Sequence, residues 1–159
     1  MRRVLGLSVA AALAAAPAVA QAPAPAPYGP ALTLAQATRV ADAAEAEARK
    51  GTTAFSIAIV EPSGQLILFR RMDGANYSAT DLAMDKARSA AAFRQPTKLW
   101  DDISRRPEGV RILGLRHAVV IEGGVPLVAG GRTVGAVGVS GGSAQADGII
   151  AAAGAAALR

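Results

Sequence analysis

The sequence GGVPLVAGGRTVGAVGVSGG, residues 123–142, decides the fold of this chain. It holds two apolar runs rich in valine, Val125–Ala129 and Thr133–Val139, which predict two β-strands. The pair Gly130–Gly131 joins them, and a two-residue glycine turn is typical of an antiparallel hairpin. The glycines after the second run open an alanine-rich segment, residues 144–158, which predicts a closing helix.

A second hairpin is predicted earlier in the chain. Residues 53–60 alternate apolar and smaller side chains, and residues 65–72 form the returning strand. Between them, Pro62–Gly64 has the composition of a tight turn with proline near its start. A further strand is predicted at His117–Ile121, directly before the glycine-rich turn. The pattern therefore predicts a five-stranded antiparallel sheet.

Three more helices are predicted around these strands. Thr33 and Gln36 form a capping box, which begins a helix ending at Gly51. An alanine-rich helix is expected over residues 78–94, and its small side chains allow close packing on a sheet. A shorter helical turn is expected over residues 97–103. The predicted order is αββααβββα, an α+β fold in one domain.

The first residues have the pattern of a secretory signal peptide. Arg2 and Arg3 are followed by an apolar run over residues 4–16, which is too short to span a bilayer. Ala18–Ala20 is an A-x-A cleavage site, so residues 1–20 are predicted to be removed. The mature protein is therefore expected in the periplasm or outside the cell.

Cleavage leaves an Ala/Pro-rich leader over residues 21–31 and a domain over residues 32–159. No stable membrane insertion is expected after cleavage. The whole chain has a formal net charge of +5, and removal of Arg2 and Arg3 lowers that charge by two. A charge this mild, with the basic residues scattered, does not favour nucleic acid as a partner.

The composition excludes several chemistries. The chain contains no cysteine, which excludes a disulfide framework, a thiolate nucleophile and c-type haem attachment. It contains one histidine, which excludes a histidine-rich metal cage. It also lacks the phosphate-binding and dinucleotide-binding glycine motifs. Catalytic residues therefore stay unknown, and a binding protein is favoured over an enzyme.

Three motifs in order resemble a known family. They are Arg71–Ala75 with the following helix around Lys86, then Glu122–Pro126, then Gly135–Gly141. Together they resemble the GlcG/HbpS family of small haem-binding domains, and also the C-terminal domain of PduO-type corrinoid adenosyltransferases. The resemblance covers residues 32–158. It implies a profilin-like fold, a haem cofactor and a homo-oligomer.

Two residues are candidate iron ligands in such a protein. His117 is the only imidazole of the chain and therefore the best nitrogen donor for haem iron. An ordinary histidine at the end of a strand is the alternative. Tyr77, before the alanine-rich helix, is a possible oxygen ligand, with a simple turn aromatic as its alternative.

Three charged residues are candidate partners of a ligand. Lys86 on the alanine-rich helix could bind a haem propionate, or could form a structural ion pair with Asp73 or Glu122. Glu122 matches a family motif and could orient Lys86 or cap its turn. Arg94 is a second candidate for a propionate. Lys86 and Glu122 are expected to belong to one site.

These features predict an exported haem-binding protein, with haem sequestering or haem degradation as its role. The alternative is an enzyme or accessory protein that binds a small organic acid or a corrinoid-related metabolite. In that case Lys86, Glu122 and Arg94 would hold a carboxylate of the metabolite. A structural or sensory domain without a ligand is the third reading.

Overall fold

A computed structural model describes residues 24–158. The predicted signal peptide therefore lies outside the described residues. The elements are α1 (Leu34–Ala48), β1 (Ser56–Val60), β2 (Leu66–Arg71), α2 (Tyr77–Phe93), α3 (Thr97–Ser104), the 3₁₀ helix η1 (Pro107–Gly114), β3 (Gly124–Ala129), β4 (Arg132–Ser140) and α4 (Ala144–Ala156).

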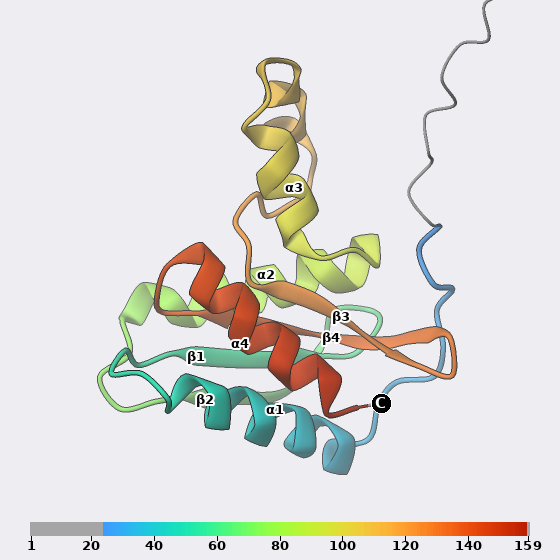
Figure 1. Ribbon diagram of the computed structural model, residues 1–159. Helices are drawn as coiled ribbons and strands as arrows, with labels where there is room; N and C mark the ends of the chain where they lie inside the picture. Colours follow the sequence, from blue (N-terminus) through green and yellow to red (C-terminus); the bar gives the residue numbers. More distant parts are fainter. Residues whose placement is uncertain (1–23, 159) are drawn as a thin grey trace, which may run out of the picture.

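The sheet is antiparallel, and its strand order is β2-β1-β4-β3 (Figure 1). Both predicted hairpins are present, and they meet where β1 pairs with β4 in the centre of the sheet. Val139 of β4 lies opposite Ile57 of β1, and Val137 lies opposite both Ile59 of β1 and Val125 of β3. The α+β class and the antiparallel sheet predicted from the sequence are therefore confirmed.

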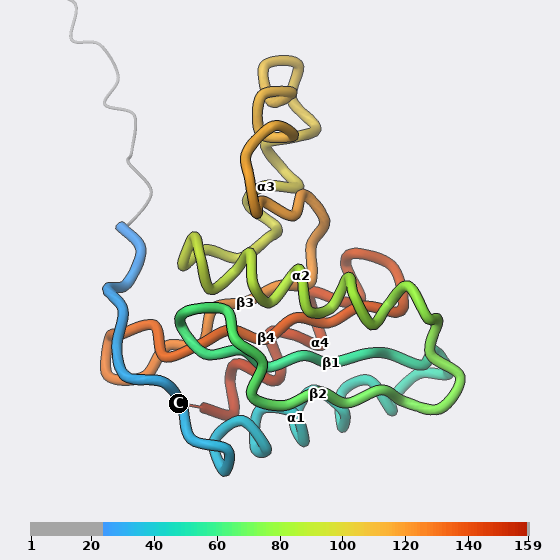
Figure 2. Tube along the Cα trace, turned by 180° about the vertical axis from the view of Figure 1, so that it is seen from behind, coloured from blue at the N-terminus to red at the C-terminus, as the bar shows by residue number. Residues whose placement is uncertain are grey.

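Helices cover both faces of this sheet. α1 packs on β1 and β2, and α4 packs on β3 and β4, while α2 crosses the opposite face (Figures 1 and 2). Side chains alternate along a strand, so Ile57 and Ile59 belong to the core under α1 and α4, whereas Ala58 and Val60 face α2. Because both faces are covered, the side chains that alternate with Ile57 and Ile59 in β1 are buried as well.

The alanines of α2 face the sheet, as predicted. Ala83, Ala87, Ala90 and Ala91 are fully buried, and a Cβ placed on Gly138 of β4 would lie 2.1 Å from the carbonyl oxygen of Ala83. Small side chains on both elements thus allow their backbones to come close together. The outer face of α2 is left to its polar residues.

The predicted fifth strand is wrong within the described residues: the sheet has four strands, and His117–Ile121 is not one of them. His117 has a positive φ of 69°, which interrupts extended backbone. The next backbone groups do not pair with a strand: the N–H of Ala118 donates to the carbonyl of Leu115 at 3.1 Å, and the N–H of Val119 donates to Ser89 Oγ at 3.0 Å. Helix η1 precedes this segment, so the order αββααβββα is also corrected.

Residues 97–121, here called the arm, project from the domain as α3, η1 and the returning segment (Figure 1). α3 and η1 pack mainly on each other. Large apolar side chains of the arm are exposed, namely Leu99, Val110, Leu113, Leu115 and Ile121. The arm is therefore a projection whose exposed surface mixes these apolar side chains with charged ones, among them Arg105, Glu108 and Arg111.

Part of the Ala/Pro-rich leader is held against the domain. The N–H of Gly29 donates to the carbonyl of Thr133, and the N–H of Thr133 donates to the carbonyl of Pro27, both at 2.8 Å. The hydroxyl of Tyr28 donates to the carbonyls of Ala91 and Ala92 at the end of α2. The leader thus lies beside the first residues of β4, which are not paired with β1 (Figures 1 and 2).

Candidate functional site

Lys86 lies in the interior and forms an ion pair with Asp147 of α4. Its Nζ lies 2.6 Å from the Asp147 carboxylate and donates at 3.1 Å to the carbonyl of Val139. The Lys86 side chain is fully buried and that of Asp147 is 3% exposed. The partner is therefore Asp147, and not Asp73 or Glu122 as the sequence suggested. The charge of Lys86 is already balanced inside the protein.

The Glu-Gly-Gly turn packs directly on this pair. Gly123 has a φ of 133°, and a Cβ there would lie 2.8 Å from Lys86 Nζ. The carboxylate of Glu122 lies against Gly148 of α4, where a Cβ would come within 2.2 Å of Oε1. The structure therefore brings the two motifs together, but the residues that lie against Lys86 are Gly123 and Gly124.

The same turn fixes the base of the arm. The N–H of Gly124 donates to Thr97 Oγ1 at 2.9 Å, and the N–H of Glu122 donates to the Asp101 carboxylate at 3.1 Å. Both acceptors belong to α3. Sequence reasoning missed Asp147 and Asp101. A buried acid in an otherwise apolar, alanine-rich helix was the available signal for Asp147.

His117 lies in a groove along the outer face of α2. Two hollows of about 240 and 250 Å³ share His117 and Arg88 as lining residues. A third hollow of about 500 Å³ adjoins them through Ser63 and Ala92. We call these hollows the α2 groove; its walls are Asp85, Arg88 and Ala92 of α2, Pro62–Gln65 of the β1–β2 turn, His117–Val119 of the arm, and Tyr28.

The remaining two candidates lie at opposite ends of α2. Arg94 ends the helix with a φ of 53°, stacks at 4.8 Å on the ring of Tyr28 and donates to the carbonyl of Ala26. Tyr77 begins the helix, is 88% exposed, and lies under the guanidinium of Arg71. Of the five candidates, only His117 lines the α2 groove, while Arg94 supports the Tyr28 end of it.

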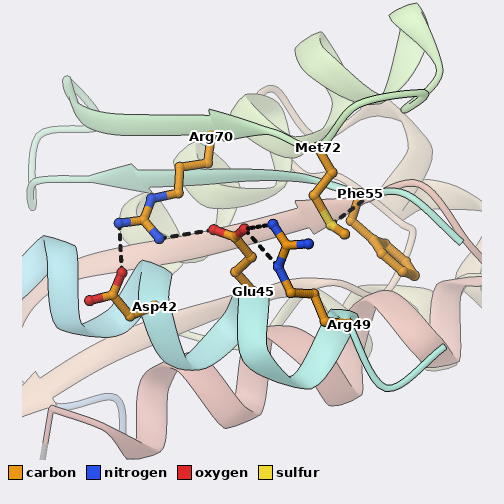
Figure 3. A network of polar contacts seen from close by, with 6 residues as sticks. All are labelled: Asp42, Glu45, Arg49, Phe55, Arg70 and Met72. Carbon is orange, nitrogen blue, oxygen red and sulfur yellow. Dashed lines mark hydrogen bonds and ion pairs between the residues drawn. The ribbon is translucent and has the colours of Figure 1, made fainter. Parts of the chain in front are cut away.

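A pocket of about 260 Å³ lies between α1 and β2, on the other side of the sheet, and includes Met72. There Arg70 bridges Asp42 and Glu45, and Arg49 also contacts Glu45 (Figure 3). The hydrogen bond from Arg49 lowers the pKa of Glu45 from its ordinary value. These charges satisfy one another, so the network joins α1 to β2.

Protein ligands for a bare metal ion are scarce. No group of three or more histidine, aspartate or glutamate side chains in the part of the chain that the structure describes could hold a metal ion. An iron carried by a porphyrin needs only axial ligands from the protein. His117, an exposed imidazole at the groove, is suited to that role.

The family model described as "Haem degrading protein HbpS-like" matches residues 32–156. Protein GlcG of Escherichia coli K12 is 34% identical over 109 residues, which cover 69% of this chain and 81% of GlcG.

Two solved structures share the fold. A double mutant of Streptomyces reticuli HbpS is 33% identical with a TM-score of 0.75, covering 92% of this chain and 99% of that one. The PduOC–haem complex is 27% identical with a TM-score of 0.72, covering 81% of this chain and 96% of that one. The resemblance to GlcG/HbpS and to PduO inferred from the motifs is confirmed.

Proposed function

The chain belongs to the HbpS-like family, and from this premise we propose that it is an exported haem-binding protein that sequesters or degrades haem. The solved PduOC–haem complex, with the same fold, supports haem as the ligand. In this chain the proposal rests on the α2 groove, which is lined by His117, the only histidine of the chain, and by Arg88.

The groove has the chemistry that haem requires. Haem presents an apolar ring, an iron that accepts a nitrogen ligand, and two carboxylates. His117 supplies the nitrogen, Ala92, Ala118 and Val119 supply apolar wall, and Arg88 supplies positive charge. The bound iron would bring redox chemistry, while the chain's own residues bind, orient and partly shield the ring.

Haemin is expected to bind the mature domain with a saturable shift of its Soret band. His117→Ala is expected to change the position of that band, because the iron loses its imidazole ligand. Tyr77→Phe is the matched control, since Tyr77 is exposed and lies outside the groove. An unchanged band in His117→Ala with a changed one in Tyr77→Phe would move the ligand to Tyr77.

A second function is favoured by the size of the hollows. Each hollow beside His117 has a volume near 250 Å³, which suits a small molecule better than a whole porphyrin. In this alternative the protein is an enzyme or accessory protein for a small organic acid or a corrinoid-related metabolite. Thermal stabilisation by a carboxylate, without any haemin binding, would favour it.

Self-association through the arm is also part of the proposal, with a second copy of the chain as the partner. Apart from Ala92, which lines the α2 groove, the alanines of α2 are buried on the sheet, so they are not free to form contacts between subunits. Val110 and Leu113 of η1 are 64% and 61% exposed, and their removal from water would stabilise an oligomer. HbpS-type relatives share this fold across most of the chain.

Light scattering of the mature protein at micromolar concentration is expected to give a mass above that of a monomer. The double variant Val110→Ser/Leu113→Ser is expected to shift the mass toward the monomer. Ile149→Ser, which removes an apolar side chain that is 54% exposed on α4, is the matched control and should leave the mass unchanged. A strictly monomeric parent would contradict this part of the proposal.

Export is proposed from the N-terminal pattern. Sequencing of protein recovered from the periplasm or the medium is expected to begin near Gln21, after the Ala18–Ala20 site. Protein that starts at Met1 and stays in the cytoplasm would contradict export. Among the described residues, no helix has the length and apolar character needed to cross a membrane.

A further inference from the structure

Arg88 occupies the middle of the α2 groove. It lines both hollows that include His117, and it lies one helical turn after Asp85. Its aliphatic stem lies beside the β1–β2 turn, where a Cβ placed on Gly64 would lie 3.6 Å from Arg88 Cγ.

The guanidinium of Arg88 retains free hydrogen-bonding capacity. Among the described residues it makes one hydrogen bond, through Nη1 to Asp85 at 3.4 Å. Both side chains of this pair are about half exposed, at 50% and 55%, so the pair is long and weak. An arginine has five N–H donors, and two of them can bind both oxygens of one carboxylate.

Other cations near α2 are already engaged. Lys86 is buried against Asp147, and Arg94 stacks on Tyr28 and bonds to the leader backbone. Neither lines the hollows that contain His117. Arg88 is therefore the cation that is placed to bind a carboxylate in the hollows beside His117.

We propose that Arg88 binds a carboxylate of the ligand in the α2 groove while His117 faces the iron, and that Asp85 competes with the ligand for Arg88. This inference rests on the proposed haem function and names the residue that recognises a propionate. Lys86, for which the sequence left open a propionate or a structural ion pair, instead pairs with Asp147 beside the Glu-Gly-Gly turn. The two cations of the same helix thus have separate tasks.

The test compares haemin with haemin dimethyl ester, in which both carboxylates are capped. The parent is expected to bind haemin about tenfold more tightly than the ester, the value of one charge-assisted contact. Arg88→Gln is expected to lose this preference while its Soret position stays that of the parent, because His117 is intact. Asp85→Asn is expected to bind haemin more tightly than the parent, since it frees Arg88.

Lys98→Gln is the matched control. Lys98 forms a pair of similar exposure with Asp102 on the arm, so its removal changes the net charge equally without touching the groove. If the parent binds haemin and its ester equally, or Arg88→Gln keeps the preference, the role of Arg88 is refuted and haem binding stands. If the parent binds neither compound, the haem function itself is refuted.

Discussion

Lys86→Met is expected to destabilise the domain by about 3–5 kcal/mol, because it removes one partner of a buried ion pair. Lys86 is the largest fully buried side chain among the described residues, and Asp147 is almost as deeply buried. Without Lys86, the Asp147 carboxylate would keep the N–H of Gly142 as its bonding partner and would have no balancing charge. The measurement is urea unfolding followed by circular dichroism.

The double variant Lys86→Met/Asp147→Asn distinguishes the interaction between the two residues from the contribution of each residue to stability. Asp147→Asn is expected to be destabilising in the parent, but to recover stability in the Lys86→Met background, since the unpaired charge is removed. Lys98→Met, which breaks an exposed ion pair on the arm, is the control and should cost less than about 1 kcal/mol. Losses that add within about 0.5 kcal/mol would show that Lys86 and Asp147 do not interact.

Gly138→Ala is expected to cost about 3 kcal/mol, because the added methyl group would collide with the backbone of α2. Its Cβ would lie 2.1 Å from the carbonyl oxygen of Ala83 and 2.5 Å from the nitrogen of Ala87. Backbone cannot move aside as a side chain can, so α2 must shift as a whole. The same shift would displace Arg88 and Asp85, so haemin affinity should fall with the unfolding free energy.

Gly114→Ala is the control for this substitution. Its Cβ would meet no atom within 4 Å, and the change should alter the unfolding free energy by less than about 0.5 kcal/mol. Thermal and urea unfolding of both variants gives the comparison. Equal stability of Gly138→Ala and the parent would mean that α2 and β4 are less closely packed than the structure shows.

The sequence identified some residues of the candidate site and missed others. It identified Lys86 and Glu122 from their motifs and expected them to meet, and Figure 1 shows how α2, the turn before β3 and α4 converge there. It did not pair Asp147 with Lys86, because the two are 61 positions apart, and the one local signal, an acid in an apolar helix, does not name a partner. It also did not single out Arg88, since an exposed arginine on a helix is ordinary until its neighbours are known.

The fifth strand was predicted wrongly for a related reason. His117–Ile121 has the β-branched composition of a strand, but composition cannot show whether a partner strand is available. In the structure, the carbonyl of Leu115 and the hydroxyl of Ser89 accept the hydrogen bonds of Ala118 and Val119, which a neighbouring strand would otherwise accept. The segment therefore returns along α2 and places His117 at the groove.

What the sequence alone determined was local or shared with a family: the two hairpins, the four α-helices of the described residues and the relationship to the HbpS-like family. Turn glycines, caps and side-chain periodicity act over a few residues, so they can be read along the chain. The tertiary structure alone decided which charges are buried and which line the α2 groove. Lys86 and Arg88 are two residues apart, yet helix geometry turns one into the core and the other into the groove. Burial depends on what packs against each face, and that is set by segments far away in the sequence.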